Sequence, residues 1–197
     1  MREDLRQPRV RAPRPDRKGF TLVELVMVVA LIGIVAAMAI PRMNTSAMHA
    51  DAAARNIRGA IQVAQRTAVM RQYDVIVSID ADAGALRVVE DRNDNSAVDV
   101  GERTTWIRLD NGVAFATPPA PVGLATGPKG AVMLSQPRNI DGLPSVIFRR
   151  NGAASSDAEL FIRGPRGRDA DFRAVTITRA TGRADWFRRG DHWRAAS

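Results

Sequence analysis

The sequence predicts an α+β protein in which a long N-terminal helix packs on an antiparallel β domain. Three observations predict this class. An apolar run begins at Phe20, small apolar residues then recur at helical spacing over residues 50–68, and short apolar segments alternate with turn residues from Val75 onward. We therefore expect a helix over residues 20–72 and a β domain over residues 73–197.

The first part of the predicted helix is apolar enough to span a membrane. Its 21 residues from Phe20 to Ile40 include one charged side chain, that of Glu24. At about 1.5 Å per residue the run is roughly 31 Å long, the thickness of the hydrocarbon core of a bilayer. We expect a transmembrane segment over residues 20–41. A charge there costs about 2.5–3.5 kcal/mol, so Glu24 has either a partner or a route to the headgroups.

Charge is unevenly distributed along the chain, whose formal net charge is +8. Residues 1–19 carry seven basic and three acidic side chains, and residues 163–197 carry nine arginines and four aspartates. Residues 1–18 are rich in arginine and proline, so we expect this leader to be disordered. Its positive charge orients the span with the N-terminus in the cytoplasm. The absence of cysteine excludes disulfides, thiol catalysis and cysteine-bound metals.

The second part of the helix has one apolar face. Its apolar residues recur every three or four positions, at Ala50, Ala54, Ile57, Ile61, Ala64 and Ala68. This spacing is typical of an amphipathic helix, and small alanine side chains suit close packing against a sheet. We expect the helix to end near Tyr73.

Short strands separated by turns follow the helix. Two hairpins are predicted: Val75–Asp80 with Leu86–Glu90 around Asp82-Ala83-Gly84, and Trp106–Leu109 with Val113–Ala116 around Asp110-Asn111-Gly112. The later strands are Val132–Leu134, Val146–Arg149, Leu160–Arg163, Ala174–Thr178 and Arg183–Phe187. Residues 117–130 are rich in proline and glycine and should form an exposed loop.

The residues around Glu24 resemble the processing site of type IV pilin-like proteins. A basic leader ends in Lys18-Gly19, Phe20-Thr21-Leu22-x-Glu24 follows, and Pro41 ends the apolar segment. The resemblance implies that prepilin peptidase cuts between Gly19 and Phe20 and methylates the new N-terminal Phe20. It also implies that Glu24 meets the N-terminal amine of a neighbouring subunit during assembly.

The C-terminal half is similar to the GspH/FimT group of minor pseudopilins. The similarity lies in Ile147-Phe148, Asn151-Gly152, Val175-Thr176-Ile177 and Thr181-Gly182-Arg183. It implies a low-abundance structural subunit of a type II secretion pseudopilus or a type IV pilus-like filament. Such a subunit is held in the bacterial inner membrane with its β domain in the periplasm, and its partners are other pilins and prepilin peptidase.

An ordinary secretory signal is the alternative for the N-terminus. Ala37-Met38-Ala39 has the small-residue pattern of a signal peptidase site, which would place the mature N-terminus at Ile40. Glu24 counts against this alternative because it interrupts the apolar region, which is also longer than such regions usually are.

A twelve-residue loop has the ligand spacing of an EF-hand calcium site. Oxygen-bearing side chains stand at its positions 1, 3, 5, 9 and 12, namely Asp91, Asn93, Asn95, Asp99 and Glu102. Position 6 is Ser96 instead of the usual glycine, and the flanking segments look like strands. The sequence leaves calcium binding and a plain polar loop as alternatives.

The arginine-rich C-terminus raises DNA binding as an alternative function, because arginines can neutralise phosphates. The candidates are Arg183, Arg188 and Arg189. FimT-like pilins that take up DNA end in Gly-Arg-x-Arg, whereas here Asp185 follows at the fourth position. Strand alternation places Trp186 on the same side as the core residues Val175 and Ile177, not on a base-stacking surface.

Enzymatic chemistry has little support in the sequence. His49 and His192 belong to no catalytic or metal-binding motif, and Gly164-Pro165-Arg166-Gly167 is typical of a turn, not of a phosphate loop. The sequence predicts a protein that is not an enzyme.

Overall fold

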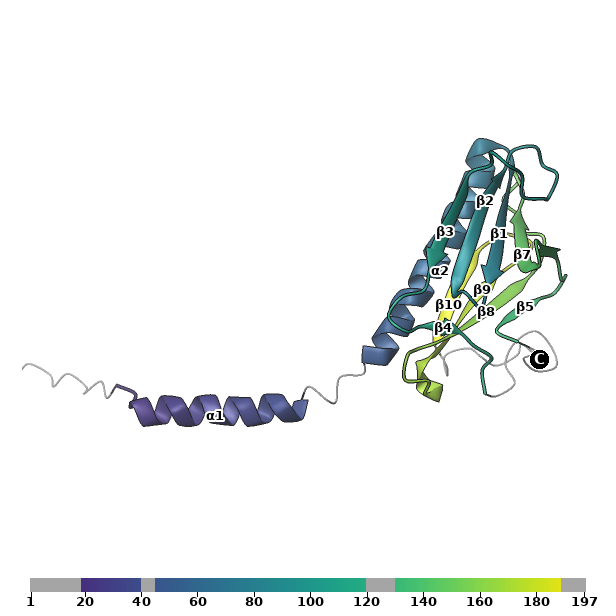
Figure 1. The fold of residues 1–197 in the computed structure, drawn as a ribbon. Coiled ribbons are helices and arrows are strands. Elements are labelled where there is room, and N and C mark those ends of the chain that lie inside the picture. The colour runs from purple at the N-terminus through teal and green to yellow at the C-terminus, as the bar shows by residue number, and fades with distance from the viewer. Residues whose placement is uncertain (1–18, 40–44, 120–129, 189–197) are drawn as a thin grey trace, which may run out of the picture. The chain divides into compact units, whose positions relative to one another are not determined.

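The computed structural model describes residues 19–39, 45–119 and 130–188, which belong to two units that divide at residue 43 (Figure 1). The first unit contains helix α1 (Leu22–Ala39). The second contains helix α2 (Thr45–Arg71), the short 3-10 helix η2 (Asp169–Asp171) and ten strands. The strands are β1 (Asp74–Asp80), β2 (Ala85–Asp91), β3 (Thr104–Arg108), β4 (Ala114–Phe115), β5 (Val132–Leu134), β6 (Asn139–Ile140), β7 (Leu143–Phe148), β8 (Ala158–Arg163), β9 (Phe172–Ile177) and β10 (Ala184–Arg188).

Apart from Glu24, helix α1 is apolar around its whole circumference. Its large apolar side chains from Leu22 to Val35 are between 47% and 79% exposed, as expected of a helix without a core of its own. Within the described part of the chain, no helix has the length and apolarity needed to cross a membrane. The leader residues 1–18, and Ile40 and Pro41 of the expected span, lie outside the described residues.

Helix α2 buries the predicted apolar stripe. Ala50, Ala54, Ile57, Ile61, Ala64 and Ala68 are each at most 1% exposed. The helix ends at Arg71, two residues before the predicted end, because Gln72 adopts a left-handed conformation with φ 58°. The N–H of Gln72 still donates to the Ala68 carbonyl at 3.0 Å, so the last turn is closed.

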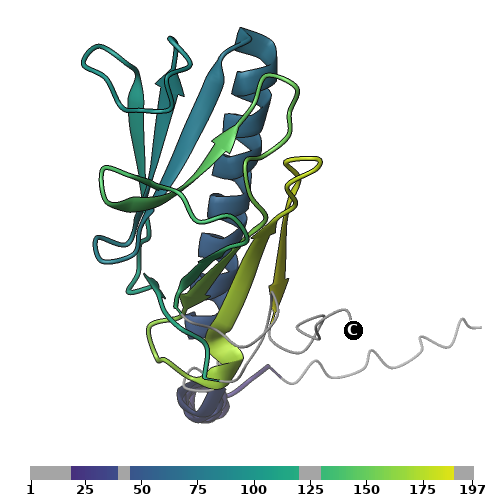
Figure 2. The same ribbon diagram turned by 90° about the vertical axis from the view of Figure 1, so that its right-hand side faces the viewer.

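Two antiparallel sheets pack on α2 (Figure 2). The first sheet has the strand order β3-β2-β1-β7-β6, and the second has the order β10-β9-β8-β4, with β5 also paired to β8. One continuous core joins α2 to both sheets and includes Leu86, Phe148, Leu160 and Val175. This arrangement confirms the predicted α+β class, with a helix packed on an antiparallel β domain.

The first predicted hairpin is confirmed, because β1 and β2 pair in register from Asp74 with Asp91 to Asp80 with Ala85. The later predicted strands correspond to β5, β7, β8, β9 and β10 within two or three residues at their ends. The very short β6 and the single turn η2 were not predicted. Of the predicted loop over residues 117–130, residues 120–129 lie outside the described residues.

The second predicted hairpin is wrong. The turn itself forms, since Val113 donates to the Asp110 carbonyl at 3.2 Å and Gly112 has φ 72°. Its two flanking segments, however, belong to different sheets: β3 pairs with β2, and β4 pairs with β8. Phe115, which is 8% exposed, is buried in the core between the sheets. Because Phe115 is buried there, the chain crosses from the first sheet to the second between β3 and β4.

The face of the first sheet that points away from α2 has a small core of its own. Ile76, Val89, Ile140 and Ile147 form this cluster, and Val98 from the loop after β2 packs against it. Through Val98, the cluster contacts the loop that carries the predicted calcium ligands.

Candidate functional site

Helix α1 begins immediately after the predicted cleavage site. The Thr21 hydroxyl accepts a hydrogen bond from the Glu24 backbone N–H at 3.2 Å, and the Thr21 carbonyl accepts one from Leu25 at 3.1 Å. Thr21 is therefore the N-cap, and Glu24 is the third residue of the helix. Thr-x-x-Glu is the sequence signature of a capping box, so this signal was present in the sequence but was not used.

The segment predicted to be cut is accessible in the described structure. Phe20 is 83% exposed, and no heavy atom lies within 4 Å of the position that a Cβ at Gly19 would occupy. Glu24 lies in the first turn, where free backbone N–H groups favour a negative charge. Gly19 and Phe20 thus lie just before the first turn of α1, and that turn contains Glu24.

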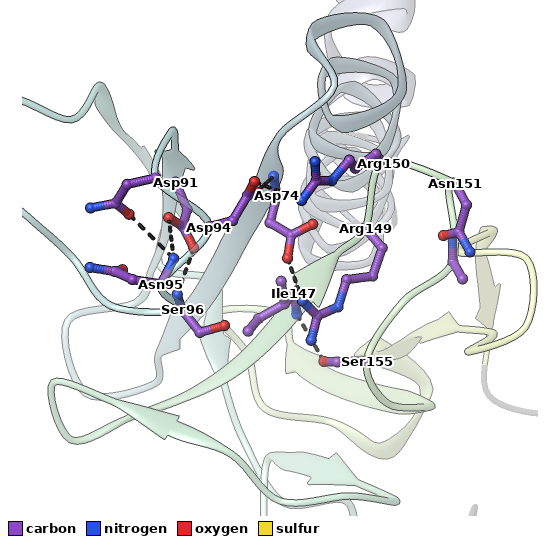
Figure 3. Close-up of polar contacts among 12 residues, drawn as sticks. Asp74, Asp91, Asp94, Asn95, Ser96, Ile147, Arg149, Arg150, Asn151 and Ser155 are labelled. Carbon is purple, nitrogen blue, oxygen red and sulfur yellow. Dashed lines mark hydrogen bonds and ion pairs between the residues drawn. The ribbon is translucent and has the colours of Figure 1, made fainter.

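The predicted calcium loop is closed by its own hydrogen bonds (Figure 3). The buried carboxylate of Asp91 accepts the N–H groups of Asn95 at 3.1 Å and Ser96 at 2.8 Å. Ser96 has φ 60°, so it adopts the conformation that glycine usually supplies at this position. The presence of Ser96 at position 6, where such loops usually have glycine, therefore does not prevent the loop from forming this turn.

The other predicted ligands are also hydrogen-bonded within the loop. Asp99 accepts the side-chain amides of Asn93 at 2.8 Å and Asn95 at 2.6 Å, which hold the pKa of Asp99 below its usual value. Glu102 accepts the N–H groups of Arg92 and Asp99, both at 3.1 Å. In the described part of the chain, no three His, Cys, Asp or Glu side chains are grouped so that they could hold a metal ion. Calcium binding stays a prediction.

One ion pair and one hydrogen bond fasten this loop to the start of β1 and to the segment after β7 (Figure 3). Asp94 accepts the Asp74 N–H at 2.8 Å and pairs with Arg150 at 2.7 Å, and Asp74 pairs with Arg149. Sequence analysis did not identify these residues, because Asp94 and Arg150 are 56 positions apart. The loop is therefore attached to the fold at two interior positions, Asp94 and Val98.

The predicted DNA-binding arginines are paired with carboxylates. Arg183 pairs with Asp185 at 2.9 Å, and Arg188 pairs with Asp51 of α2. Arg189 lies outside the described residues. Trp186 packs against the core as predicted. The guanidinium groups of Arg55 and Arg188 lie over its ring, 5.4 Å and 5.8 Å from the ring centroid.

A buried ionic cluster at the start of α2 was not foreseen. Arg173, which is 3% exposed, donates to Asp51 and to the carbonyls of Ala170 and Phe172, both at 2.7 Å. Burial by itself raises the pKa of Asp51, but the hydrogen bonds from Arg173 and Arg188 outweigh it and lower that pKa. Asp51 and Arg173 are 122 positions apart, so no local pattern could have revealed the pair.

Two motifs of the C-terminal resemblance meet at α2. The Gln65 amide donates to the carbonyls of Gly152 at 3.0 Å and Thr181 at 2.6 Å. A Cβ at Gly182 would lie 2.1 Å from the Gly152 carbonyl, and Gly182 has φ 63°. Only glycine fits at position 182. The turns that contain Asn151-Gly152 and Thr181-Gly182 therefore contact each other, and these two motifs have a structural role.

Three candidates remain, namely the segment Gly164-Pro165-Arg166-Gly167 and the two histidines. Gly167 donates to the Gly164 carbonyl at 3.0 Å, which confirms that this segment is a turn. His49 lies on α2, half-buried, and His192 lies outside the described residues.

Comparison with known proteins gives matches to both units. A model of the prokaryotic N-terminal methylation motif matches residues 14–40, and a model of the type II transport protein GspH matches residues 53–182. The pilin-like protein PilA1 of Thermus thermophilus is 28% identical over 143 residues, which cover 70% of this chain and 89% of that protein.

Two solved structures are also similar. The minor pseudopilin EpsH from the type 2 secretion system of Vibrio cholerae matches at 15% identity with a TM-score of 0.48, over 73% of this chain and 99% of that one. The type IV minor pilin FimU of Pseudomonas aeruginosa matches at 13% identity with a TM-score of 0.45, over 70% and 87% of the two chains.

A methylation motif before an apolar helix, followed by a helix packed on antiparallel sheets, defines a pilin-like protein. More than half of the chain matches the GspH model, so the chain belongs to the GspH family of type II transport proteins. It is a minor pseudopilin of a type II secretion or type IV pilus-like assembly, in which it assembles with other pilins. The resemblance found in the sequence is thereby confirmed.

Proposed function

We propose that the chain is made as a precursor, cut between Gly19 and Phe20 by prepilin peptidase and methylated on the Phe20 amine. The precursor is held in the bacterial inner membrane by residues 20–41, with the basic leader in the cytoplasm and the β domain in the periplasm. The mature subunit then joins a pilus-like filament, where its role is structural and not enzymatic. The observation that carries this proposal is the methylation motif at residues 14–40, in which an exposed Phe20 directly precedes a capped helix.

Glu24 is the residue that we propose to guide assembly. Scission after Gly19 creates a positive amine on Phe20, and Glu24 provides a negative charge in the first helical turn. At an effective dielectric constant of 20 and a separation of about 4 Å, two such charges attract by roughly 4 kcal/mol. This attraction offsets much of the cost of placing either charge in an apolar environment. An amine of one subunit next to Glu24 of its neighbour therefore favours one register of the two helices.

The substitution Glu24→Gln tests this role, because it keeps the shape of the side chain and removes its charge. We expect normal membrane insertion and normal cleavage, but loss of the subunit from sheared filaments. Asp82→Asn, which removes an exposed charge in the β1–β2 turn, is the matched control and should incorporate like the unaltered chain. Normal incorporation of the Glu24→Gln variant would refute the proposed role.

A further inference from the structure

An apolar groove lies between α2 and the neighbouring edge of the first sheet. Its volume is about 330 Å³, and its lining includes Gly59, Ala60 and Val63 of α2, Val88 of β2, and Thr105 and Ile107 of β3. Glu90 is the carboxylate in this lining, and it already accepts the Tyr73 hydroxyl and pairs with Arg103 at 3.7 Å. The groove therefore suits apolar side chains better than a charged ligand.

The groove follows a second stripe of α2, beside the stripe buried in the core. Asn56, Ala60, Val63 and Thr67 recur every three or four positions and line it. Val63 is 62% exposed, and a Cβ at Gly59 would meet nothing within 4 Å. The described residues thus leave room over this stripe for the side chains of another segment.

Strand β3 forms the open edge of the sheet at this groove (Figure 1). Glu90 donates to the Arg103 carbonyl at 3.0 Å and Leu109 donates to the Gly84 carbonyl at 2.8 Å, which sets the alternation of the antiparallel ladder. Thr105 and Ile107 accordingly bond toward β2. The N–H and C=O groups of Thr104, Trp106 and Arg108 point away from the sheet and offer a template for another strand.

A single added strand could use both features. Its backbone would pair with the edge of β3, and the side chains on one of its faces would fill the groove. Such a strand would bond to Thr104, Trp106 and Arg108, and every second side chain would point into the groove against Gly59 and Val63. Two exposed arginines flank this edge: Arg108 is the last residue of β3, and Arg103, which precedes the strand, is 66% exposed although it pairs with Glu90. They favour acidic residues at the ends of the bound segment.

We propose that β3 and this groove bind an extended segment of a partner protein, with apolar side chains at alternate positions and acidic residues at its ends. The bound segment becomes a further strand of the first sheet. This interaction surface goes beyond the proposed processing and assembly role, because it uses no residue of the N-terminal site.

The test uses the full mature chain in detergent and the fluorescent peptide Glu-Val-Thr-Val-Thr-Val-Thr-Val-Glu. A peptide of equal composition with the four valines grouped together controls for binding to apolar surface or micelles. We expect saturable binding of the alternating peptide, at least tenfold weaker binding of the grouped one, and slowed hydrogen exchange at Thr104, Trp106 and Arg108.

Two variants at one position test the groove separately from the fold. Gly59→Phe fills the groove without a clash at Cβ and should weaken peptide binding at least tenfold, while Gly59→Ala should bind like the unaltered chain. Equal binding of both peptides, no binding at millimolar peptide, or unchanged exchange in β3 would overturn the proposal. Sedimentation that shows dimers lost in Gly59→Phe would assign the edge to a second copy instead, and would also overturn it.

Discussion

The Thr21 hydroxyl accepts the backbone N–H of Glu24 at 3.2 Å, so the residue proposed to guide assembly also helps to form the first turn of α1. Only Phe20 lies between the proposed scission and this cap. The proposed cleavage site is therefore almost adjacent to the start of α1. The amine that scission would create on Phe20 directly precedes the first, capped turn of the helix.

Loss of the cap should loosen this first turn. Thr21→Ala removes the acceptor and costs about 0.5–2 kcal/mol of helix stability, whereas Thr21→Ser retains it. We expect faster amide hydrogen exchange at Glu24 and Leu25 in Thr21→Ala than in Thr21→Ser. Identical exchange in the two variants would show that the hydroxyl does not cap the helix.

The buried pair of Asp51 with Arg173 should be a major source of stability. Asp51→Ala leaves the guanidinium of Arg173 buried without its carboxylate partner, so we expect the free energy of unfolding to fall by about 3–5 kcal/mol at neutral pH. Urea denaturation measures this change. Asp82→Ala, at an exposed position, should change it by less than about 0.5 kcal/mol, and a similar effect of both variants would contradict the account.

The same pair predicts a pH dependence. The pKa of Asp51 in the folded chain is lower than the ordinary value of 3.8, so the folded state binds the proton less readily than the unfolded state. The stabilisation is therefore complete above the unfolded pKa and is lost as the pH falls through the folded pKa. We expect the stability difference between the unaltered chain and Asp51→Ala to shrink between about pH 5 and pH 2. A difference that stays constant over this range would contradict the assignment.

The loop over residues 91–102 gives a prediction on calcium. Asp99 is the exposed carboxylate toward which both Asn93 and Asn95 point, so calcium binding should need it. If the loop binds calcium, isothermal titration gives heat with the unaltered chain and with Asp82→Ala, but none with Asp99→Ala. No heat at millimolar calcium would exclude the site.

DNA binding is not favoured by the ion pairs at the C-terminal end of the fold. Since Asp185 engages Arg183 and Asp51 engages Arg188, we expect no salt-sensitive gel shift of duplex DNA by the unaltered chain. Asp185→Arg frees Arg183 and adds a cation, so it should bind DNA more tightly at low salt. A strong shift by the unaltered chain that high salt abolishes would restore the DNA-uptake alternative.

Local sequence patterns correctly predicted those features that depend only on residues close together in the chain. The stripe from Ala50 to Ala68 was correct because helical spacing is a property of one segment. Asp110-Asn111-Gly112 correctly predicted a turn but not its partners, because turn residues set backbone angles and leave strand pairing to core burial at Phe115. The pair of Asp51 with Arg173 depends on the tertiary fold alone, and no pattern within a segment could reveal it.

Mass spectrometry of the N-terminus of the mature protein tests the central proposal most directly. The account predicts a chain that begins with a methylated Phe20 and retains the apolar segment that follows. A mature chain that begins at Ile40 would contradict it, because the protein would then have lost both Glu24 and the helix that carries it.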